Sequence, residues 1–238
     1  MDETEFDKFA LEYRALHAAN IKLSGEQPEY FAEYKVVDVV AELVRVRGDI
    51  ARPPAVLDFG AGVGYSVPHF ARHLPGARIT CIDVSRKSLE IGAAEHGGQA
   101  EFRHFDGAAI PYADGTFDVA LASCVFHHIP HAKHVALLAE LRRVLTDDGL
   151  LLVFEHNPLN PLTRHAVNTC VFDEHAELML APTLRRRVRA AGFAAPRIRY
   201  RIFVPGWLRS LRWLEKGLTW LPLGAQYYVV ASKTTERS

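Results

Sequence analysis

Short apolar runs alternate with longer segments of helical periodicity along most of the chain. The runs are rich in Val, Ile, Leu and Phe, and proline, glycine or turn residues bound them. Runs of this kind are typical of buried strands, and strands that alternate with helices favour an α/β fold. Strands are predicted at residues 55–58, 78–82, 101–106, 117–122, 150–154, 193–204 and 226–232.

Apolar residues at helical spacing predict helices at residues 5–19, 28–48, 65–73, 134–145, 162–168 and 183–191. The first two helices precede the first strand and are expected to form a cap on the core. The residues expected to define the apolar side of the second helix are Tyr30, Phe31, Tyr34, Val37, Val40, Ala41 and Val44. In the helix at 134–145, the residues expected to face inward are Val135, Leu138, Leu141 and Leu145.

Composition narrows the class of protein. With 238 residues and 49% hydrophobic content, the chain is expected to form one large domain. Lys plus Arg and Asp plus Glu both number 28, which argues against nucleic acid as a main partner. Three widely spaced cysteines favour free thiols in a reducing cytosol. Because residues 1–10 do not resemble a signal peptide and no apolar run approaches about 20 residues, we expect a cytoplasmic protein. We expect it to be a monomer or a homodimer.

The first predicted strand ends in an acid and then breaks into alternating glycines, in the sequence AVLDFGAGVGY. Gly60, Gly62 and Gly64 lie where the strand must turn into a helix, and their backbone can approach a ligand closely. The dinucleotide fingerprint G-x-G-x-x-G is not met, because Tyr65 occupies its third glycine position, and no P-loop lysine follows. The loop is therefore predicted to hold a different cofactor.

A second motif supports one family. The phrase P-x-x-D-x-x-F-D is formed by Pro111, Asp114, Phe117 and Asp118 before an apolar run. Together with the pattern hydrophobic-hydrophobic-Asp-x-Gly-x-Gly-x-Gly, it resembles the class I S-adenosylmethionine-dependent methyltransferases of the type-11-like group. The segment LRRVLTDDGLLLVFE also resembles that family, with Asp148 in place of its first glycine.

The resemblance implies a Rossmann-like, doubly wound, seven-stranded α/β sheet that is mostly parallel, with an antiparallel last strand and helices on both faces. It implies S-adenosylmethionine as the cofactor. Within a single domain over residues 1–238, we expect an N-terminal helical cap at 1–50 and a cofactor-binding core at 51–156. Residues 157–238 would then supply the acceptor side.

Cofactor contacts follow from the same resemblance. Asp83 would accept hydrogen bonds from the ribose hydroxyls, although it could also cap the helix that begins near Ser85. Asp106 would accept from the adenine amino group, and the N–H of Ala108 would contact the ring. Tyr30, Tyr34 or Lys35 either closes over the cofactor or only packs. The full set expected to bind the cofactor is Asp58, Gly60, Ala61, Gly62, Gly64, Asp83, Val84, Asp106, Gly107, Ala108, Ser123 and Tyr34.

Candidate catalytic residues lie at the ends of the fourth and fifth strands. If the acceptor is a hydroxyl, a base must take its proton, and His128, His156 and Glu155 are the candidates. Asn157, Asn160 and Arg164 are candidates for contacting the acceptor, while turn and capping roles are the alternative for the asparagines. No metal is expected from the histidines at 127, 128, 131 and 134, because Pro130 is expected to begin a helix and separate them.

Two further segments are unusual in composition. The arginine-rich helix at 183–191 is expected to be a solvated face. Residues 206–225 contain many large apolar side chains, including all three tryptophans. These either pack on the core or on a dimer partner, or form an apolar wall for an acceptor or a membrane surface, with membrane contact the less favoured alternative.

The predicted function is methyl transfer from S-adenosylmethionine to an oxygen or nitrogen of a small molecule, such as a natural product, a sugar or a lipid-linked metabolite. One alternative is a relative that binds the cofactor but catalyses another reaction. A second is a methyltransferase that acts on a membrane lipid. A third is an NAD-dependent or nucleotide-sugar oxidoreductase, which Tyr65 argues against.

Overall fold

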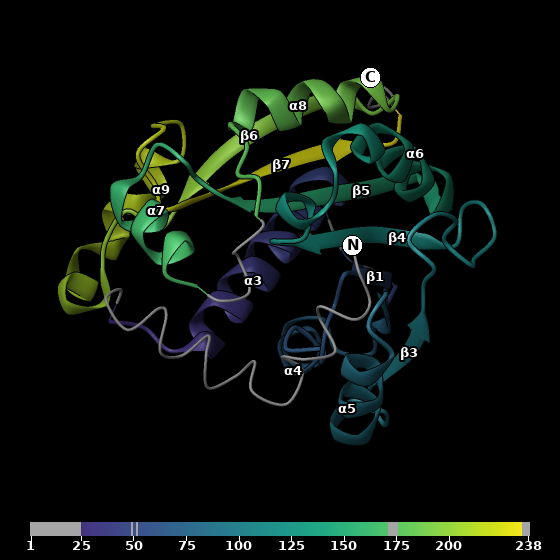
Figure 1. Cartoon of the computed structure of the whole chain (residues 1–238). Coiled ribbons are helices and arrows are strands. Elements are labelled where there is room, and N and C mark those ends of the chain that lie inside the picture. Colours follow the sequence, from purple (N-terminus) through teal and green to yellow (C-terminus); the bar gives the residue numbers. More distant parts are fainter. Residues whose placement is uncertain (1–24, 49, 51, 171–175, 235–238) are drawn as a thin grey trace.

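The computed structural model describes residues 25–48, 50, 52–170 and 176–234. A single seven-stranded sheet runs through the molecule in the order β3-β2-β1-β4-β5-β7-β6, with helices on both sides (Figure 1). The strands are β1 (Ala55–Phe59), β2 (Arg78–Asp83), β3 (Ala100–His104), β4 (Phe117–Ser123), β5 (Leu145–His156), β6 (Ala194–Arg201) and β7 (Gln226–Ser232). The predicted helix at 5–19 lies outside the described residues.

The pairing of the strands confirms the predicted fold class. The strands β1 to β5 pair in parallel, whereas β7 is antiparallel to both of its neighbours, β5 and β6. The strand order reverses at the β1–β4 pair, because β2 and β3 extend to one side of it and β5 to the other. Open α/β sheets bind ligands at the carboxyl ends of the strands beside such a reversal. In this sheet those strand ends are Phe59 and Ser123, so a ligand site is expected there.

Alternate residues of the central strands enter two separate cores. On β5, Leu150, Leu152 and Phe154 face one core, and Leu151 and Val153 face the other. The first core lies beneath α3 (Pro28–Arg47) and α4 (Val67–His73), and the second beneath α6 (His134–Val144) and α8 (Ala181–Ala190). A strand that is covered on both faces has apolar residues at consecutive positions, so these strands could be predicted from the sequence.

The remaining helices are short. They are α5 (Arg86–His96), which packs on β2 and β3, α7 (Pro161–Asn168), α9 (Glu215–Leu218) and the 3₁₀ segments η2 (Phe126–His128), η3 (His131–Lys133) and η5 (Gly206–Leu214). Among the described helices, none is long and apolar enough to cross a membrane.

The buried side of α3 agrees with the prediction for Phe31 and Tyr34 but differs from it further along the helix. Val37 and Val44 are 41% and 44% exposed, whereas Val36, Val39 and Leu43 are fully buried. Valines occur around much of this helix, so apolar spacing alone did not identify the side that contacts the sheet. In α6, Leu138 and Leu141 are buried as predicted, but the expectation for Val135 was wrong because it is 38% exposed.

Several element boundaries also differ from the prediction. Residues 147–149, between the predicted helix at 134–145 and the predicted strand at 150–154, lie within β5, where the pairing with β4 jumps from Leu145 to Leu150. These residues form an irregular extension of the strand and not a separate turn, and Leu145 belongs to β5 and not to α6. In addition, β3 ends at His104, β6 ends at Arg201, and α4 begins at Val67.

The tryptophan-rich segment does not pack on the core of its own chain. Trp207, Trp213 and Trp220 are between 70% and 74% exposed, so the first expectation for residues 206–225 was wrong in that respect. The arginine-rich helix α8 does expose Arg185, Arg186 and Arg189, as predicted.

Asp118 of the P-x-x-D-x-x-F-D motif anchors the start of β1. Its carboxylate accepts the N–H of Ala55 at 2.8 Å and pairs with Arg52 at 2.6 Å and Arg47 at 3.1 Å. Burial opposes its ionisation, but the Ala55 amide and Arg47 outweigh that effect and lower the pKa of Asp118. The motif therefore has a structural role, joining β4 to β1 and to the end of α3.

Replacing Asp118 with Asn is expected to lower the free energy of unfolding by about 2 kcal/mol near neutral pH, because two arginines lose their buried partner. The folded-state pKa of Asp118 is lowered, so its stabilisation is present above the unfolded pKa and is lost as the pH falls through the folded pKa. Urea unfolding should therefore separate D118N from the wild type near pH 7 and show convergence in acid. The exposed Asp148→Asn is the matched control, and an equal loss in both variants would contradict this role.

Candidate active site

The glycine loop leaves the carboxyl end of β1 with three glycines at positive φ. Gly60, Gly62 and Gly64 have φ values of 72°, 55° and 80°. A Cβ at Gly60 would lie 2.5 Å from Val125, and one at Gly64 would lie 2.9 Å from Phe102, whereas one at Gly62 would meet nothing within 4 Å. The first and third glycines are therefore required by packing as well as by φ, and Gly62 borders open space.

The N–H groups of this loop bond within the protein. Those of Gly60 and Ala61 donate to the carbonyl of Ile82 at 2.8 and 3.1 Å, and that of Gly64 donates to the carbonyl of Ala61 at 2.9 Å. The N–H of Gly62 donates to Asp83 Oδ2 at 2.8 Å. These four N–H groups therefore donate to protein acceptors in this arrangement, and the loop offers a ligand the space at Gly62 and the carboxylate of Asp83.

Asp83 ends β2 and holds the glycine loop beside α5. Its Oδ1 accepts the N–H of Ser85 at 2.8 Å, while Ser85 itself caps α5 through the N–H of Ser88. Burial raises the pKa of Asp83 even though the Ser85 and Gly62 amides oppose that shift. A carboxylate oxygen has two lone pairs, so each oxygen of Asp83 retains capacity for a ligand hydroxyl.

Asp58 lies on β1 with one carboxylate oxygen unpaired. Oδ2 accepts the hydroxyl of Ser66, but Oδ1 is buried and has no hydrogen-bond partner. Burial raises the pKa of Asp58 to about 6, against the hydrogen bond of Ser66 and the charge of Lys35. A buried carboxylate oxygen without a donor is costly, so this position is complementary to a ligand that carries a positive charge and N–H donors.

Asp106, after β3, forms a tight turn with its own chain. Its Oδ1 accepts the N–H of Ala108 at 2.8 Å and that of Ala109 at 3.1 Å, and these bonds lower the pKa of Asp106. The N–H of Ala108 is therefore already bonded to Asp106. Gly107, at a φ of 83°, lies against Val84, so these predicted residues share one side of the site.

A polar cluster joins α3 to the ends of β4 and β7. Lys35 Nζ donates to Ser123 Oγ at 2.8 Å and to Cys124 Sγ at 3.4 Å. Gln226 Nε2 donates to Cys124 Sγ at 3.7 Å, and the hydroxyl of Tyr34 donates to Gln226 Oε1. Burial opposes ionisation of the Cys124 thiol, but Lys35 and His156 outweigh it and lower its pKa to about 7.

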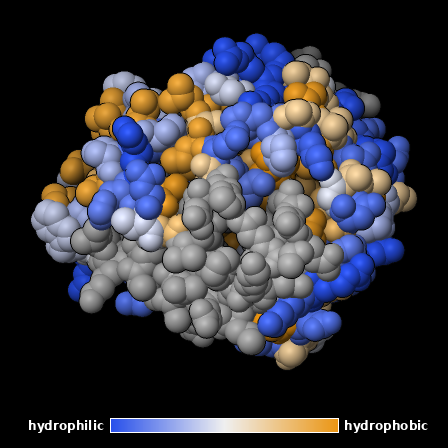
Figure 2. All heavy atoms as spheres, viewed as in Figure 1, coloured by the Kyte–Doolittle hydropathy of each residue, from blue (hydrophilic) through white to orange (hydrophobic). Residues whose placement is uncertain are grey.

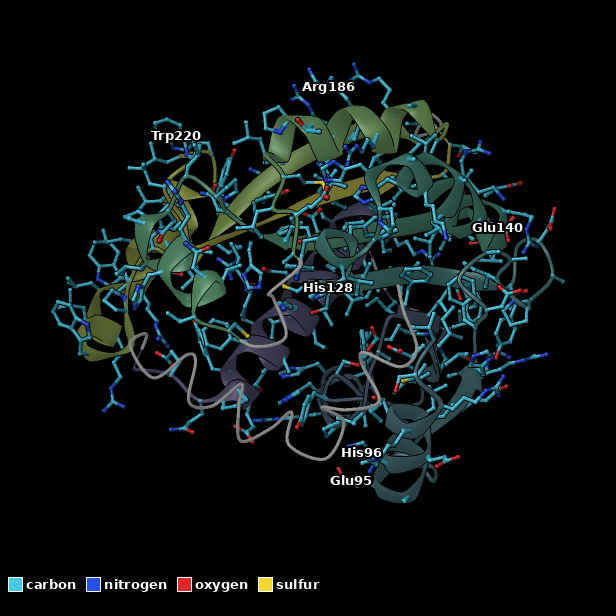
Figure 3. The ribbon with its side chains drawn as sticks, viewed as in Figure 1. Glu95, His96, His128, Glu140, Arg186 and Trp220 are labelled. Carbon is cyan, nitrogen blue, oxygen red and sulfur yellow. The ribbon has the colours of Figure 1, made fainter. Side chains whose placement is uncertain are left out.

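Three histidines extend this cluster toward the ends of β4 and β5. The His127 ring lies 4.1 Å from that of His128 and 5.2 Å from that of His156, measured between centroids. His128 lies in the middle of the molecule, near the carboxyl end of β4 (Figure 3). His156 Nδ1 accepts from Gln226 Nε2 at 3.4 Å. Two of the predicted base candidates, His128 and His156, therefore share one site.

The carboxylate of Glu155 contacts His127 of this histidine group. Its Oε2 lies 2.6 Å from His127 Nδ1, and its Oε1 accepts the N–H of Phe126 at 2.8 Å. Burial opposes its ionisation, but the attraction and hydrogen bond of His127 outweigh it and lower the pKa of Glu155. With both oxygens bonded and the side chain 1% exposed, Glu155 fits an anchor for η2 better than a base.

The asparagines after β5 bond to the backbone. Asn157 Nδ2 donates to the carbonyls of Pro222 and Gly224, at 3.1 and 2.8 Å. Asn160 caps α7 and its Nδ2 donates to the carbonyl of Leu223 at 2.9 Å. These are the turn and capping contacts of the alternative interpretation, while Arg164 lies exposed on α7. A role of the three residues in binding an acceptor stays a prediction.

Sequence reasoning missed Cys124, Gln226 and Ser66. Cys124 directly follows Ser123 at the end of β4, and that position was a usable signal. No local signal indicated Gln226 or Ser66. The partners of Gln226 lie far away in the sequence, and Ser66 contacts Asp58 across the glycine loop. Within the described residues no group of histidines, cysteines and acids could hold a metal ion.

A family described as "Methyltransferase domain" matches residues 56–149, from β1 to the irregular part of β5. The match contains the glycine loop, the Asp83 and Asp106 strand ends and the P-x-x-D-x-x-F-D motif.

Curated relatives are methyltransferases as well. The malonyl-[acyl-carrier protein] O-methyltransferase of Geobacter sulfurreducens is 26% identical over 77% of this chain and 73% of its own length. The demethylmenaquinone methyltransferase of Thermotoga maritima is 30% identical over 65% of this chain and 61% of its own. The chain spans about half the length, or less, of several other curated relatives that it matches.

Solved structures agree in fold. A methyltransferase of Thermotoga maritima superposes with a TM-score of 0.66 at 18% identity, covering 97% of this chain and 99% of that one. The similarity therefore extends beyond the matched segment to both ends of the sheet. Residues 56–149 carry a methyltransferase domain, and the chain has the fold of an S-adenosylmethionine-dependent methyltransferase.

Proposed function

We propose that this enzyme transfers the methyl group of S-adenosylmethionine to an oxygen or nitrogen atom of a small molecule. The observation that carries the proposal is the buried, unpaired oxygen of Asp58 on β1, the strand from which the glycine loop leaves. We further propose the division into an N-terminal cap, a cofactor core at 51–156 and an acceptor side at 157–238.

The residues present fit this cofactor. Its methionine end carries an ammonium group, which can donate to the unpaired Asp58 Oδ1, and its sulfonium is a second positive charge. Asp83 retains lone pairs for ribose hydroxyls at the end of the neighbouring strand. The cofactor supplies a methyl group already activated by the sulfonium, so the protein has to orient the acceptor and exclude water.

Acceptor chemistry is assigned to the cluster at the ends of β4, β5 and β7. His156 lies between Cys124 and Gln226, and the imidazole of His156 or His128 can take the proton of an acceptor hydroxyl. Glu155 fixes the orientation of His127, whose ring contacts those of both histidines at tilted angles. An amine presented in its neutral form would need only orientation and desolvation at the same place.

The relatives support a small-molecule acceptor. Their names include O-methyltransferases and demethylmenaquinone methyltransferases, although a release factor glutamine methyltransferase also occurs among them. Equal numbers of basic and acidic residues give this chain no strong field for a nucleic acid.

The proposal is tested by incubating the enzyme and trideuteromethyl-labelled cofactor with the small-molecule fraction of a cell extract. We expect labelled metabolites by mass spectrometry, and a loss of about hundredfold in their rate of formation for His156→Ala, the effect of removing a general base. The exposed His165→Ala is the matched control. Label that appears only in protein, or cofactor consumed without any labelled product, would overturn the proposal.

Binding of S-adenosylhomocysteine is expected to weaken as the pH falls below about 6, because protonation of Asp58 removes the charge that faces the ligand ammonium. Asp58→Asn should lower the affinity by about 10- to 100-fold near neutral pH and abolish the acid limb of the profile. Isothermal titration calorimetry measures both effects, with Asp114→Asn as a matched exposed control. An unchanged profile in D58N would assign the pH dependence elsewhere.

Cys124 is expected to react with iodoacetamide along a pH curve whose midpoint is about 7. Replacing Lys35 with Met removes a positive charge 3.4 Å from the sulfur, so the midpoint should rise toward or above about 8.5. The measurement is made in a Cys170→Ser background, with Cys81 fully buried. A midpoint that does not respond to K35M would show that the Lys35–Cys124 contact does not form in solution.

A further inference from the structure

Residues 206–225 form an exposed apolar surface at one end of the sheet. Trp207, Trp213 and Trp220 project from η5 and the turn after α9, together with three leucines that are 40% to 59% exposed, Leu211, Leu214 and Leu223. Apolar atoms gather over α7 and α9 in the space-filling view (Figure 2), and Trp220 lies at the outer rim, away from His128. We refer to this set as the tryptophan surface.

The start of α7 continues the tryptophan surface. Asn160 Nδ2 donates to the carbonyl of Leu223, and Asn157 Nδ2 donates to the carbonyls on either side of it. These bonds join the segment that carries Leu159 and Leu162, which are 55% and 66% exposed, to the backbone of residues 222–224. Apolar side chains from two separate segments are therefore held on one face, where solvation by water is unfavourable.

This segment, residues 206–225, exposes only positive charges. Glu215 is its only acid, and it is buried, accepting the N–H groups of Phe203 and Val204 at 2.9 and 2.8 Å. Arg212 pairs with Glu26. The exposed charges are those of Arg209 and Lys216, so the apolar face carries positive charge at its edge.

Exposed tryptophans together with positive charges favour one kind of binding partner over another. A two-fold contact with a second copy would bring Arg209 and Lys216 of both copies onto the same interface, where like charges repel. Lysine is also depleted at the centres of protein interfaces. Tryptophan, by contrast, prefers the boundary between lipid and water, and basic side chains next to it are attracted to anionic headgroups.

We propose that the tryptophan surface docks this protein onto the surface of an anionic membrane, without crossing it. The docking inference stands apart from the proposed function, because it uses no residue assigned to cofactor binding or to proton transfer. The tryptophan surface is joined to the proposed acceptor site through the backbone, because the N–H of Asn157, next to His156, donates to the carbonyl of Ala225, next to Gln226, at 3.0 Å.

The chain provides its own probe, because all three of its tryptophans lie in this surface. Vesicles of phosphatidylcholine mixed with phosphatidylglycerol should shift the tryptophan emission of the full chain to the blue, and lipids brominated in the acyl chain should quench it. Vesicles of phosphatidylcholine alone should bind much more weakly, and added salt should release the protein.

Two variants test the surface by vesicle sedimentation and emission. Arg209→Glu with Lys216→Glu should lower the affinity at least about 25-fold, at about fivefold for each lost cation. The matched control is Arg78→Glu with Lys133→Glu, one exposed arginine and one exposed lysine elsewhere, with an expected change below about threefold. Trp207→Ala with Trp213→Ala, in which Trp220 still reports emission, should abolish sedimentation while thermal unfolding is unchanged.

Three outcomes would overturn the inference. The first is a wild-type protein that ignores anionic vesicles. The second is an equal loss in the charge variant and its control, which would assign binding to the overall charge of the molecule. The third is a dimer in analytical ultracentrifugation that the tryptophan variant dissociates, which would make the surface a contact between copies. Loss of methyl transfer with docking intact would affect only the proposed function.

Discussion

A buried carboxylate with one oxygen unpaired is the constraint on which the site depends. Asp58 is fixed on a strand that lies between two others, so it cannot turn toward water to solvate that oxygen. Ser66 satisfies one oxygen, and the other remains a localised negative potential in a low-dielectric setting. The free energy lost in burying this group is recovered when a cationic donor binds, which makes the site complementary to one kind of ligand.

The site has two halves, one acidic and the other formed by Lys35, Cys124 and the histidines. Asp58 and Asp83 lie at the ends of β1 and β2, on the side of the glycine loop, whereas Lys35, Cys124 and the histidines lie at the ends of β4 and β5. The reversal of strand order at β1 and β4 keeps these halves adjacent without mixing them. The acids are placed to attract a cationic cofactor, and the second half is placed to exchange protons with an acceptor.

Much of the fold was readable from the sequence because its central strands are buried on both faces and bounded by glycine and proline. The glycine loop and the acids at residues 58, 83 and 106 are likewise local features, fixed by their position after a strand. The side of α3 that faces the sheet was not readable, since valines occur around the helix and only contact selects Val36 and Val39. The cluster of Lys35, Cys124 and Gln226 joins residues up to 191 positions apart, so no local pattern could reveal it.

The place of β7 between β5 and β6 has a consequence for biosynthesis. Until residues 226–232 leave the ribosome, β5 exposes a row of unpaired backbone groups and β6 has no neighbour in the sheet. Gln226 also arrives only then, so the Cys124 thiol and the Tyr34 hydroxyl lack this partner in every shorter nascent chain. Completion of the sheet therefore waits until β7 has been translated, and a nascent chain stalled before β7 would present an open sheet edge to chaperones.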